Sequence, residues 1–574
     1  METQIIETKN KLANFQKVNG SHYTPELLAR FVAKQIVEAT KGQFSDSIKI
    51  LDPAVGDGEL LISLLNKLPS NTLKRVHVTG FDTNKEAINA GFIRIKNLFP
   101  NITPNLSCDN FVHISQEYDL ENNLSPFAPQ KFDLVIANPP YVRTQILGAN
   151  KAQQLANTFE LTGRIDLYHV FIRGIAAVLR PGGIAGIIVS NRFMTTKAGL
   201  EIRKIIKKNF EILHLWDLGD TRLFDAAVLP AVLLLKKKNI TDIQQTTPKF
   251  TSIYSTNETI SKYDCENVIA ALDKEGVVKV KNDNYYLVRQ GKLDLEKNTD
   301  SVWSIATNTS DKWLLTVQAN TFCTFGEVGK IRVGVKTTAD KVFIRDDWDS
   351  LPASQQPELL KPLITHHIAR RYKSHSTDKK ILYTHYIKDG KRAVVNLQDF
   401  PHSKEYLNKH KTVLEAREYI SQGGRNWFEI WVPQNPASWS KPKIVFRDIT
   451  ATPTFWMDLD GAVVNGDCYW LTDDFKKDEN LLWLCLAVGN SSFIEVFYDH
   501  SFNNKLYAGR RRFMTQYVEK FPLPDPASIV AKRIIKKTKS LYNLLPSADS
   551  EKLEKEINKL VWKSFGFSPE EISW

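Results

Sequence analysis

Cysteine is scarce in this sequence. The chain of 574 residues has five, and they are Cys108, Cys265, Cys323, Cys468 and Cys485. None belongs to a C-x-x-C pair or lies beside a histidine pattern, so the spacing supports neither a zinc site nor a disulfide framework. We therefore expect reduced thiols and no bound metal.

Long apolar runs are also missing. The first residues, METQIIETKNKLANFQK, are polar and lack the apolar stretch of a signal peptide. No segment approaches the roughly 20 consecutive apolar residues that a membrane-spanning helix needs. We expect a cytoplasmic protein without a membrane partner.

Negative charge is in deficit. The chain has 76 Lys and Arg against 64 Asp and Glu, a formal net charge of +12. This balance favours a polyanionic partner. The length exceeds one ordinary core, since a domain usually takes roughly 100 to 200 residues, and predicts two large domains with accessory segments.

Residues 47–238 alternate short β-branched runs with helical patterns. The predicted strands are IKILDPAV, HVTGFDTN, FDLVIANPP, GIAGIIVSN, ILHLWDLGD and AVLLLKKK, and predicted helices lie between them, including 84–98 and 166–179, the second closed by a PGG stop signal. This alternation is typical of a doubly wound α/β sheet, which binds ligands at the carboxyl ends of its strands. Before the first strand, TPELLARFVAKQIVEAT predicts a helix with Thr24 as N-cap and Pro25 in its first turn.

The character of the chain changes after residue 238. The polar, turn-rich segment ITDIQQTTPKFTSIYSTNET predicts a linker. Short aromatic runs, loops and basic clusters then predict a mixed, mostly β, second domain. The lysine-rich periodicity from Ala527 predicts one or two helices. We expect domains at 1–245 and 246–526 and a C-terminal helical segment at 527–574.

The segment ILDPAVGDGELL predicts a ligand-binding loop. A strand ends at Asp52, the turn that follows contains Ala54, Gly56 and Gly58, and a helix begins at Glu59. Glycines allow the backbone to approach a ligand closely, and the helix start offers free N–H groups. The spacing differs from the G-x-G-x-x-G of dinucleotide sites, and an acidic residue inside the loop argues for a ligand that also carries a cationic group.

Two further acids follow the next predicted strands. Asp82 is placed to accept hydrogen bonds from ribose hydroxyls, as an acid at the end of the second strand does in Rossmann-like folds. Asp109 could accept a hydrogen bond from the amine of an adenine. A nucleoside with a charged, amine-bearing tail satisfies all three acids, so S-adenosylmethionine fits better than NAD.

The segment IANPPYV directly follows the fourth buried strand. Its two prolines stiffen the turn and aim the side chain of Asn138. The exocyclic amine of a purine is a poor nucleophile because its lone pair is delocalised into the ring. If the side-chain oxygen of Asn138 and the carbonyl of Pro139 each accept one N–H, the lone pair is freed, and Tyr141 can stack on the base.

These motifs together resemble a known family. HYTPELL, LDPAVGDGELL, GFDTN, CDNF and ANPPYV are similar in sequence and order to the gamma class of adenine-N6 DNA methyltransferases of restriction-modification systems, including the TaqI-like and Eco57I-like enzymes. The resemblance covers about residues 20–240, and more loosely 325–524. It implies a Rossmann-like S-adenosylmethionine-dependent methyltransferase domain followed by a DNA target-recognition domain and a helical tail.

The resemblance also implies roles for individual residues. Thr24 and the Asp52 loop would hold the methionine part of the cofactor, Asp82 the ribose, Asp109 the adenine amine, and Pro139 part of the cofactor wall. Asn138 and Pro139 would bind the target N6, with Tyr141 on one face of the base and Phe224 on the other. The target adenine must be extruded from the duplex.

The second domain would supply the contacts to double-stranded DNA. Lys505 and the cluster Arg510, Arg511 and Arg512 are suited to phosphates. For any one of these residues, the alternative to a phosphate contact is a charge that simply lies on a solvated face. About twenty residues precede the first motif, too few for a fused nuclease domain, so we expect no cleavage by this chain and a separate cognate endonuclease as a partner, with the chain itself a monomer.

Two other functions share some of these motifs. The N-P-P-Y sequence also occurs in methyltransferases of protein glutamine amides and of RNA exocyclic amines, which are usually shorter. The chain could instead be a non-catalytic DNA-binding subunit of a defence complex. The complete set of Asn138, Tyr141, Asp52 and Gly58 argues against this, because an inactive site has no physical need for them.

Overall fold

The computed structural model of the chain describes residues 24–120, 131–141, 149–159, 166–194, 196, 199–223, 229–239, 247–256, 258–281, 283–294, 303–306, 308–417, 419–420, 423–502, 510–547 and 550–568. The chain forms two compact units, and the division falls between β12 (Ser304–Ala306) and α10 (Asn308–Ala319). The sequence placed this boundary about sixty residues earlier, at 245/246.

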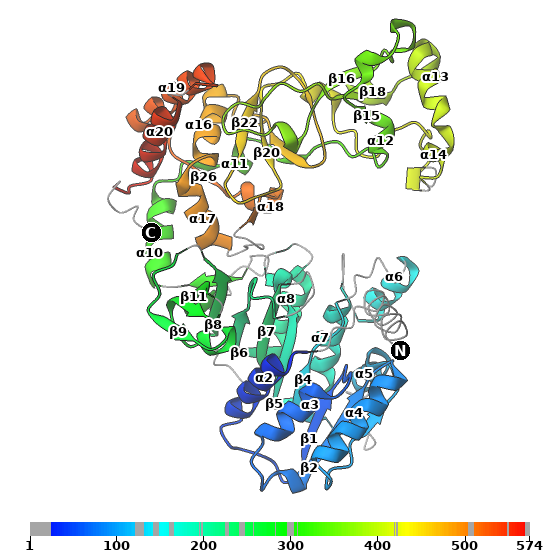
Figure 1. The fold of residues 1–574 in the computed structure, drawn as a ribbon, viewed down its shortest axis with the longest axis vertical. Coiled ribbons are helices and arrows are strands. Elements are labelled where there is room, and N and C mark those ends of the chain that lie inside the picture. Colours follow the sequence, from blue (N-terminus) through cyan, green and yellow to red (C-terminus); the bar gives the residue numbers. More distant parts are fainter. Residues whose placement is uncertain are drawn as a thin grey trace. The chain divides into compact units, whose positions relative to one another are not determined.

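The first unit is an α/β domain (Figure 1). Its strands are β1 (Ile48–Asp52), β2 (Val76–Phe81), β3 (Asn105–Ser107), β4 (Phe132–Ala137), β5 (Leu179–Ser190), β6 (Phe210–Asp217), β7 (Pro230–Lys237), β8 (Lys249–Ser255), β9 (Tyr263–Cys265), β10 (Gly276–Val280), β11 (Asn284–Asp294) and β12. Its helices include α2 (Glu26–Ala39), α3 (Glu59–Lys67), α4 (Lys85–Leu98), α5 (Phe111–Leu120), α6 (Ala149–Thr158), α7 (Leu167–Val178), α8 (Leu200–Asn209) and α9 (Val268–Ala271).

Among the described residues, these strands form one sheet in the order β3-β2-β1-β4-β5-β7-β6-β8-β11-β10-β9, with β12 paired to β11. Strands β1 to β6 run parallel, and β7 is inserted antiparallel between β5 and β6. The carboxyl ends of β1 to β6 therefore meet at one edge of the sheet. The chain reverses its direction of winding between β1 and β4, and open α/β sheets bind their ligands at such a point.

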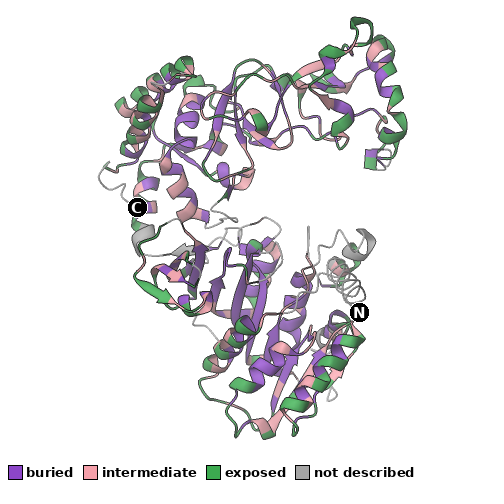
Figure 2. Cartoon of the chain, in the orientation of Figure 1, coloured by how far each residue is buried: buried purple, intermediate pink, exposed green. Residues whose placement is uncertain are grey.

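Both faces of this sheet are covered by helices, and successive side chains of a strand belong to the cores on opposite faces. In β1, Ile48 and Ile50 belong to the core under α2 and α3, while Leu51 belongs to the core on the α5 and α7 side. The central strands are almost wholly buried (Figure 2), which explains their near-continuous apolar sequence. The predicted doubly wound, Rossmann-like fold is confirmed.

Local predictions from the sequence differ from the structure at three places. The predicted linker contains β8, which pairs with β6 and extends the sheet of the first unit. The PGG signal lies inside β5, after α7 has ended at Val178. Pro25, and not Thr24, is the N-cap residue of α2; the side chain of Thr24 is engaged by the site described below.

The second unit is mixed, with small sheets and helices. Its strands are β13 (Cys323–Thr324), β14 (Arg332–Val333), β15 (Ile344–Arg345), β16 (Leu360–Ile364), β17 (Lys380–Leu382), β18 (His385–Lys388), β19 (Lys391–Val394), β20 (Lys443–Arg447), β21 (Ile449–Thr450), β22 (Phe455–Asp458), β23 (Val463–Val464), β24 (Cys468–Leu471), β25 (Arg511–Arg512) and β26 (Pro522–Leu523). Its helices include α10, α11 (Phe325–Val328), α12 (Asp340–Phe343), α13 (Pro401–Lys409), α14 (Lys411–Glu415), α16 (Glu479–Gly489), α17 (Ser492–Phe502), α18 (Thr515–Val518), α19 (Ile529–Leu544) and α20 (Ser550–Ser564).

The predicted helical tail consists of α19 and α20, which pack on each other and on α16 within the second unit. Among the described residues no individual helix has the length and apolar character of a membrane span. In the part of the chain that the structure describes, one pair of helices, α16 and α17, passes that test jointly, and it is bent by 78° at its junction. The apolar side chains of both helices lie largely in the core of the second unit.

Candidate active site

Two of the predicted site residues follow neighbouring strands at the point where the winding of the sheet reverses. Asp52 ends β1 and Asn138 directly follows β4, and these strands pair in parallel at Ile50 with Leu134. The register of the sheet therefore brings the first loop and the N-P-P-Y turn to one edge. Residues 86 apart in the sequence are adjacent because parallel strands end together.

Asp52 is 0% exposed. Its Oδ1 accepts a hydrogen bond from the backbone N–H of Ala54 at 3.0 Å, and its buried Oδ2 has no hydrogen-bond partner among the described residues. Burial, with a smaller contribution from the nearby carboxylates of Asp82 and Asp57, raises the pKa of Asp52 to about 8. A buried carboxyl group with one oxygen that accepts no hydrogen bond is suited to a cationic or N–H-bearing ligand group.

The glycines of the loop have conformations that only glycine adopts easily. Gly56 has φ +51° and Gly58 φ +86°. A Cβ on Gly58 would lie 3.3 Å from Cα of Gly91 in α4, so the loop also packs tightly against that helix. The backbone is thus held close to the sheet edge, and the start of α3 is left open for a ligand.

Asp82 directly follows β2, and its side chain also anchors the loop that contains Gly56. One carboxylate oxygen accepts from the backbone N–H of Gly56 and the other from that of Asn84, each at 2.9 Å. A carboxylate oxygen has two acceptor positions, so this anchoring is compatible with a further hydrogen bond from a ligand hydroxyl. The sequence indicated only the ligand contact and missed the anchoring role.

Asp109 follows β3 by two residues and is exposed. The hydroxyl of Ser107 donates to its carboxylate. The adjacent Asn110 accepts from the backbone N–H of Val112 at the start of α5. Asp109 is therefore at the same edge as Asp52 and Asp82, with its side chain directed by a neighbouring hydroxyl.

A hydrogen-bonded chain joins Thr24, Asn138 and Tyr141. Nδ2 of Asn138 donates to the hydroxyl oxygen of Thr24 at 3.0 Å, and the hydroxyl of Tyr141 donates to Oδ1 of Asn138 at 3.0 Å. Pro139 is buried, while Asn138 and Tyr141 are half-buried. Desolvation raises the pKa of Tyr141, so this phenol stays a hydrogen-bond donor at neutral pH. The carboxamide of Asn138 is therefore oriented from both ends, by its neighbour Tyr141 and by Thr24, which lies 114 residues before it in the sequence.

A buried polar network lies at the same edge, and no functional role for it was predicted from the sequence. Nδ2 of Asn191 donates to Asp217 at 2.9 Å, and the hydroxyl of Tyr254 donates to the other oxygen of Asp217 at 2.7 Å. Burial raises the pKa of Asp217 to about 6. The available signal was a polar residue at or near the end of two predicted strands. Asn191 ends GIAGIIVSN, and Asp217 lies near the end of ILHLWDLGD. The network fixes the segment that leaves β6 towards Phe224, which lies outside the described residues.

The predicted basic cluster divides into residues with different environments. Arg511 is 8% exposed, and its guanidinium donates two hydrogen bonds of 2.8 Å to Asp499. Arg512 makes a similar pair of 3.0 Å bonds to Asp448. The structure therefore corrects the prediction for Arg511: its charge is buried and neutralised within the unit. Arg510 is exposed, and Lys505 lies outside the described residues.

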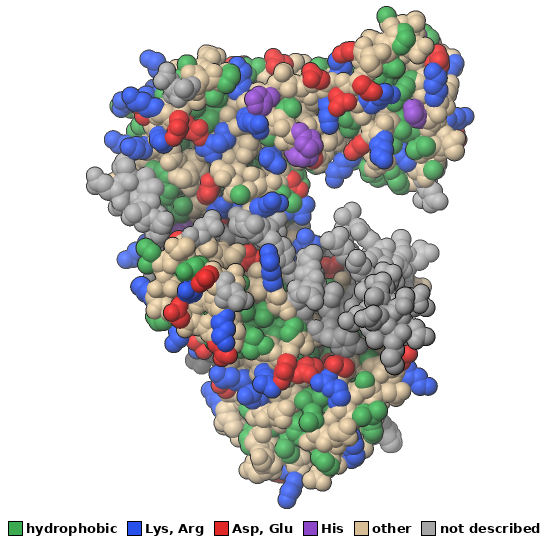
Figure 3. Space-filling view, viewed as in Figure 1, with side chains coloured by type: hydrophobic (Ala, Val, Ile, Leu, Met, Phe, Trp, Pro, Cys, Tyr) green, Lys and Arg blue, Asp and Glu red, His purple; other side chains and the backbone are tan. Residues whose placement is uncertain are grey.

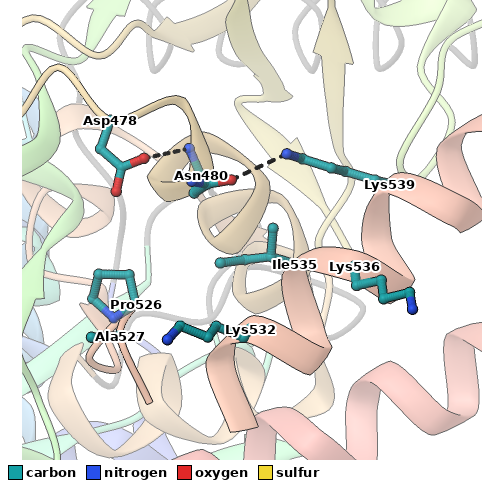
Figure 4. A pocket seen from close by; sticks show the side chains of 8 residues that line it. All are labelled: Asp478, Asn480, Pro526, Ala527, Lys532, Ile535, Lys536 and Lys539. Atoms are coloured by element: carbon teal, nitrogen blue, oxygen red, sulfur yellow. Dashed lines mark hydrogen bonds between the residues drawn. The ribbon is translucent and has the colours of Figure 1, made fainter. Parts of the chain in front are cut away.

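A cavity of about 500 Å³ in the second unit lies between the start of α16 and α19. Figure 4 shows its lining side chains, which are Asp478, Asn480, Pro526, Ala527, Lys532, Ile535, Lys536 and Lys539. None of the residues predicted for the site lines it. Within the parts of the chain that the structure describes, no cluster of three or more His, Cys, Asp or Glu could hold a metal ion.

Comparison with known proteins gives matches over both units. Residues 35–224 match the Eco57I restriction-modification methylase family, and residues 377–523 match the TaqI-like C-terminal specificity domain. The type II methyltransferase M.BanIII of Aneurinibacillus aneurinilyticus is 38% identical, over 96% of this chain and 97% of that protein. The type II methyltransferase M.BstVI of Geobacillus stearothermophilus is 25% identical, over 89% and 91%.

A solved structure with a similar fold is that of the type IIL restriction-modification enzyme MmeI in complex with DNA. The likeness covers 95% of this chain and 73% of that one, with a TM-score of 0.57 and 13% identity. It extends through both units, so the combination of the α/β domain with the mixed second unit is shared as a fold.

Proposed function

Since the chain belongs to the family of type II methyltransferases with an Eco57I-type methylase domain, we propose that the group it methylates is the exocyclic N6 of an adenine. The protein is a site-specific DNA methyltransferase of a restriction-modification system, and its cofactor is S-adenosylmethionine. The observation that supports adenine N6 most directly is the Thr24–Asn138–Tyr141 chain beside the Asp52 loop.

The residues of the first loop fit this cofactor. Its methionine part carries an ammonium group, and the idle buried oxygen of Asp52 is suited to such a cation. The left-handed glycines Gly56 and Gly58 allow close backbone approach, with Ala54 in the same turn. Asp82 would hold the ribose hydroxyls and Asp109 the adenine amine. When bound, the cofactor supplies an electrophilic methyl group on a sulfonium.

Asn138 and Pro139 would activate the target amine. The side-chain oxygen of Asn138 and the backbone carbonyl of Pro139 each accept one N–H of N6, which withdraws the lone pair from conjugation with the ring and makes it available to the methyl group. Each hydrogen bond strengthens as positive charge develops on nitrogen in the transition state. The extra proton leaves the product amine after transfer.

Thr24 and Tyr141 would keep Asn138 in the required orientation. Thr24 accepts from the amide nitrogen, so the amide oxygen is turned away from it and towards Tyr141. The ring of Tyr141 would stack on the extruded adenine, and Phe224 would cover the opposite face. Such preorganisation removes the entropic cost of aligning the carboxamide during the reaction.

The second unit would select the sequence in which the adenine lies. Its TaqI-like specificity domain supports DNA recognition by this part of the chain. Extrusion of a paired base costs a few kcal/mol, which contacts to the duplex must offset. We assign catalysis to the residues before α10 and recognition to those after it.

The test is methylation of duplex DNA, RNA and protein extracts with isotope-labelled S-adenosylmethionine, followed by mass spectrometry of the nucleosides. We expect N6-methyladenine in duplex DNA alone. Label confined to protein or RNA, or another methylated base, would refute the proposal. Mapping methylated adenines in DNA that has been exposed to the enzyme then gives the recognition sequence.

The Asn138→Ala variant tests the assigned catalytic role. It should lose methyl transfer by at least about a hundredfold, as removal of one transition-state hydrogen-bonding group typically does, while DNA binding is retained. Asn101→Ala, at an exposed asparagine of the same unit, is the matched control and should remain active. Equal loss of DNA binding and activity in Asn138→Ala would indicate a structural role.

Two statements about partners complete the proposal. The chain would act as a monomer, which light scattering of the purified protein checks. A separate cognate endonuclease would cleave the same sequence when it is unmethylated. DNA methylated by this protein should then resist that endonuclease, and unmethylated DNA should be cut.

A further inference from the structure

The second unit contains a strained loop between β14 and α12. Thr338, in the sequence VGVKTTAD, has φ +59°. A β-branched residue rarely adopts this left-handed conformation, and such outliers persist where the surrounding structure holds them. The loop is exposed at Lys336 and Thr338, and buried at Thr337 between them.

A buried arginine, Arg417, anchors this loop by a hydrogen bond to its backbone. Arg417 is 6% exposed, and its guanidinium donates to the carbonyl oxygen of Thr337 at 2.8 Å and to that of Trp427 at 2.6 Å. The side chain of Thr337 accepts from the backbone N–H of Ala339 at 3.0 Å. These contacts fix the backbone on both sides of Thr338, and the hydroxyl of Thr338 donates to the carbonyl oxygen of Thr337, which gives its side chain a defined direction and leaves the hydroxyl oxygen as an acceptor.

A second segment lies against the first in close backbone contact. A Cβ on Gly466 would lie 2.7 Å from the carbonyl oxygen of Val335 and 2.9 Å from Cγ of Lys336. The stem of Lys336 therefore lies along the backbone of Gly466. No ion pair of its ammonium group is found among the described residues, so the charge of Lys336 is directed to solvent.

Two histidines lie next to this pair of segments. Asp467 accepts from the backbone N–H of His366 at 3.3 Å, and its Oδ2 is 2.5 Å from Nδ1 of the same residue. The proton of this contact lies on Nδ1 when the ring is neutral, which leaves Nε2 as an acceptor pointing away from the carboxylate. The side chain of His366 is 38% exposed. The ring of exposed His367 lies 3.9 Å from that of His366, centroid to centroid.

We propose that Lys336, Thr338, His366 and His367 form a recognition surface that contacts base edges and phosphates of the target DNA. This inference rests on the proposed function. The lysine suits a phosphate or the acceptor edge of guanine, and an imidazole acceptor or a hydroxyl suits an exocyclic amine. Histidine is exposed on the face of the second unit drawn in Figure 3, with lysines and arginines around it.

This recognition surface extends DNA reading beyond the part of the chain that matches the specificity domain. That match begins at residue 377. Two of the three segments that meet at this surface, 336–338 and 366–367, precede the match, and the third, 466–467, falls within it. Contacts that discriminate bases must be held within a fraction of an ångström, and a strained backbone anchored by a buried arginine provides this rigidity. The surface thus replaces the buried Arg511 as a candidate contact to DNA.

The test compares methylation of the mapped recognition sequence with methylation of single-base variants of it. Lys336→Gln should lower kcat/KM on the recognition sequence by about tenfold or more, as loss of a DNA contact typically does. Thr338→Gly should leave the melting temperature unchanged or raise it, because glycine adopts φ +59° freely. It should nevertheless reduce discrimination between the cognate and variant sequences by about tenfold. Thr338→Asn, which tolerates the left-handed region and keeps a polar group, should retain more discrimination than Thr338→Gly.

Lys532→Gln is the matched control for charge, because Lys532 is an exposed lysine on α19 of the same unit. It should change discrimination by less than about twofold, since an isolated surface charge carries no base information. Unchanged kcat/KM in Lys336→Gln together with unchanged discrimination in Thr338→Gly would overturn the inference and leave this surface to an acidic protein partner. If the unaltered protein methylates no DNA at all, the proposed function fails instead. Cofactor binding should be the same in all these variants.

Discussion

Asp52 leads to a prediction about proton release. In the unfolded chain this carboxyl group ionises near its ordinary pKa of 3.8, whereas burial raises the pKa in the folded, cofactor-free protein to about 8. The folded state therefore retains a proton that the unfolded state has lost. At about 1.4 kcal/mol for each pKa unit, this group makes the folded protein on the order of 4 kcal/mol less stable at pH 7 than below pH 4. This destabilisation grows as pH rises from about 4 to about 8 and is constant above that.

Binding of the cofactor should reverse this shift, because an ammonium group beside the idle oxygen of Asp52 favours the ionised carboxylate. At pH 7 a group with a pKa near 8 is ~0.9 protonated, so binding should release ~0.9 proton. Affinity should rise about tenfold for each pH unit between pH 6 and 7. Isothermal titration with S-adenosylhomocysteine in buffers of different ionisation enthalpy measures the proton release. No release at pH 7 would refute the assignment of Asp52 to the cationic part of the cofactor.

Asp52→Asn separates the electrostatic effect from the shape of the site. The amide is nearly isosteric and cannot ionise, so the cofactor-free variant should lose less stability between pH 5 and pH 8 than the unaltered protein. Its cofactor affinity should fall and should lose most of its pH dependence. Asp46→Asn is the matched control, because Asp46 is exposed in the same unit. A stability profile of Asp52→Asn that follows that of the control would contradict the raised pKa.

Other positions give further expectations. Tyr141→Phe keeps the ring but removes the hydrogen bond to Asn138, so kcat should fall about fivefold while KM for DNA changes little, as loss of one orienting bond of about 1 kcal/mol implies; an unchanged kcat would show that Thr24 alone orients the amide. Gly58→Ala places a side chain at φ +86°, with its Cβ 3.3 Å from Cα of Gly91. It should destabilise the first unit by roughly 1–3 kcal/mol and weaken cofactor binding, measured by thermal melting and titration. Arg511→Met should lower stability by about 3–5 kcal/mol because it removes the buried guanidinium that donates two hydrogen bonds to Asp499; a variant of normal stability with weakened DNA binding would restore the predicted phosphate contact.

The alternation of strands and helices in the first unit and its doubly wound fold were predictable from sequence, and so was the placement of the candidate site residues at strand ends. Asp52 ends β1, and Asp82 and Asn138 directly follow β2 and β4, so all three lie at the carboxyl ends of neighbouring parallel strands. The N-P-P-Y turn needed no tertiary information, because proline restricts the backbone on its own. The boundary at 245/246 was not predictable in this way, because β8 looks like a turn-rich linker and becomes a strand only through pairing with β6.

The sequence by itself determined the class of chemistry: its motifs, their order and the resemblance they carry indicate an S-adenosylmethionine-dependent DNA methyltransferase and predict which loop holds the cofactor and which turn binds the target amine. Only the tertiary structure decided which charges are available. Arg511 and Arg512 look like phosphate contacts in a string of arginines, yet both are held by carboxylates more than ten residues away. The sequence predicted no individual role for Lys336 or His366; in the structure Lys336 is exposed beside a strained loop, and His366 is held by the distant Asp467. Charge is a property of a residue, but the partner of that charge is set by folding, which brings together groups that the sequence keeps apart.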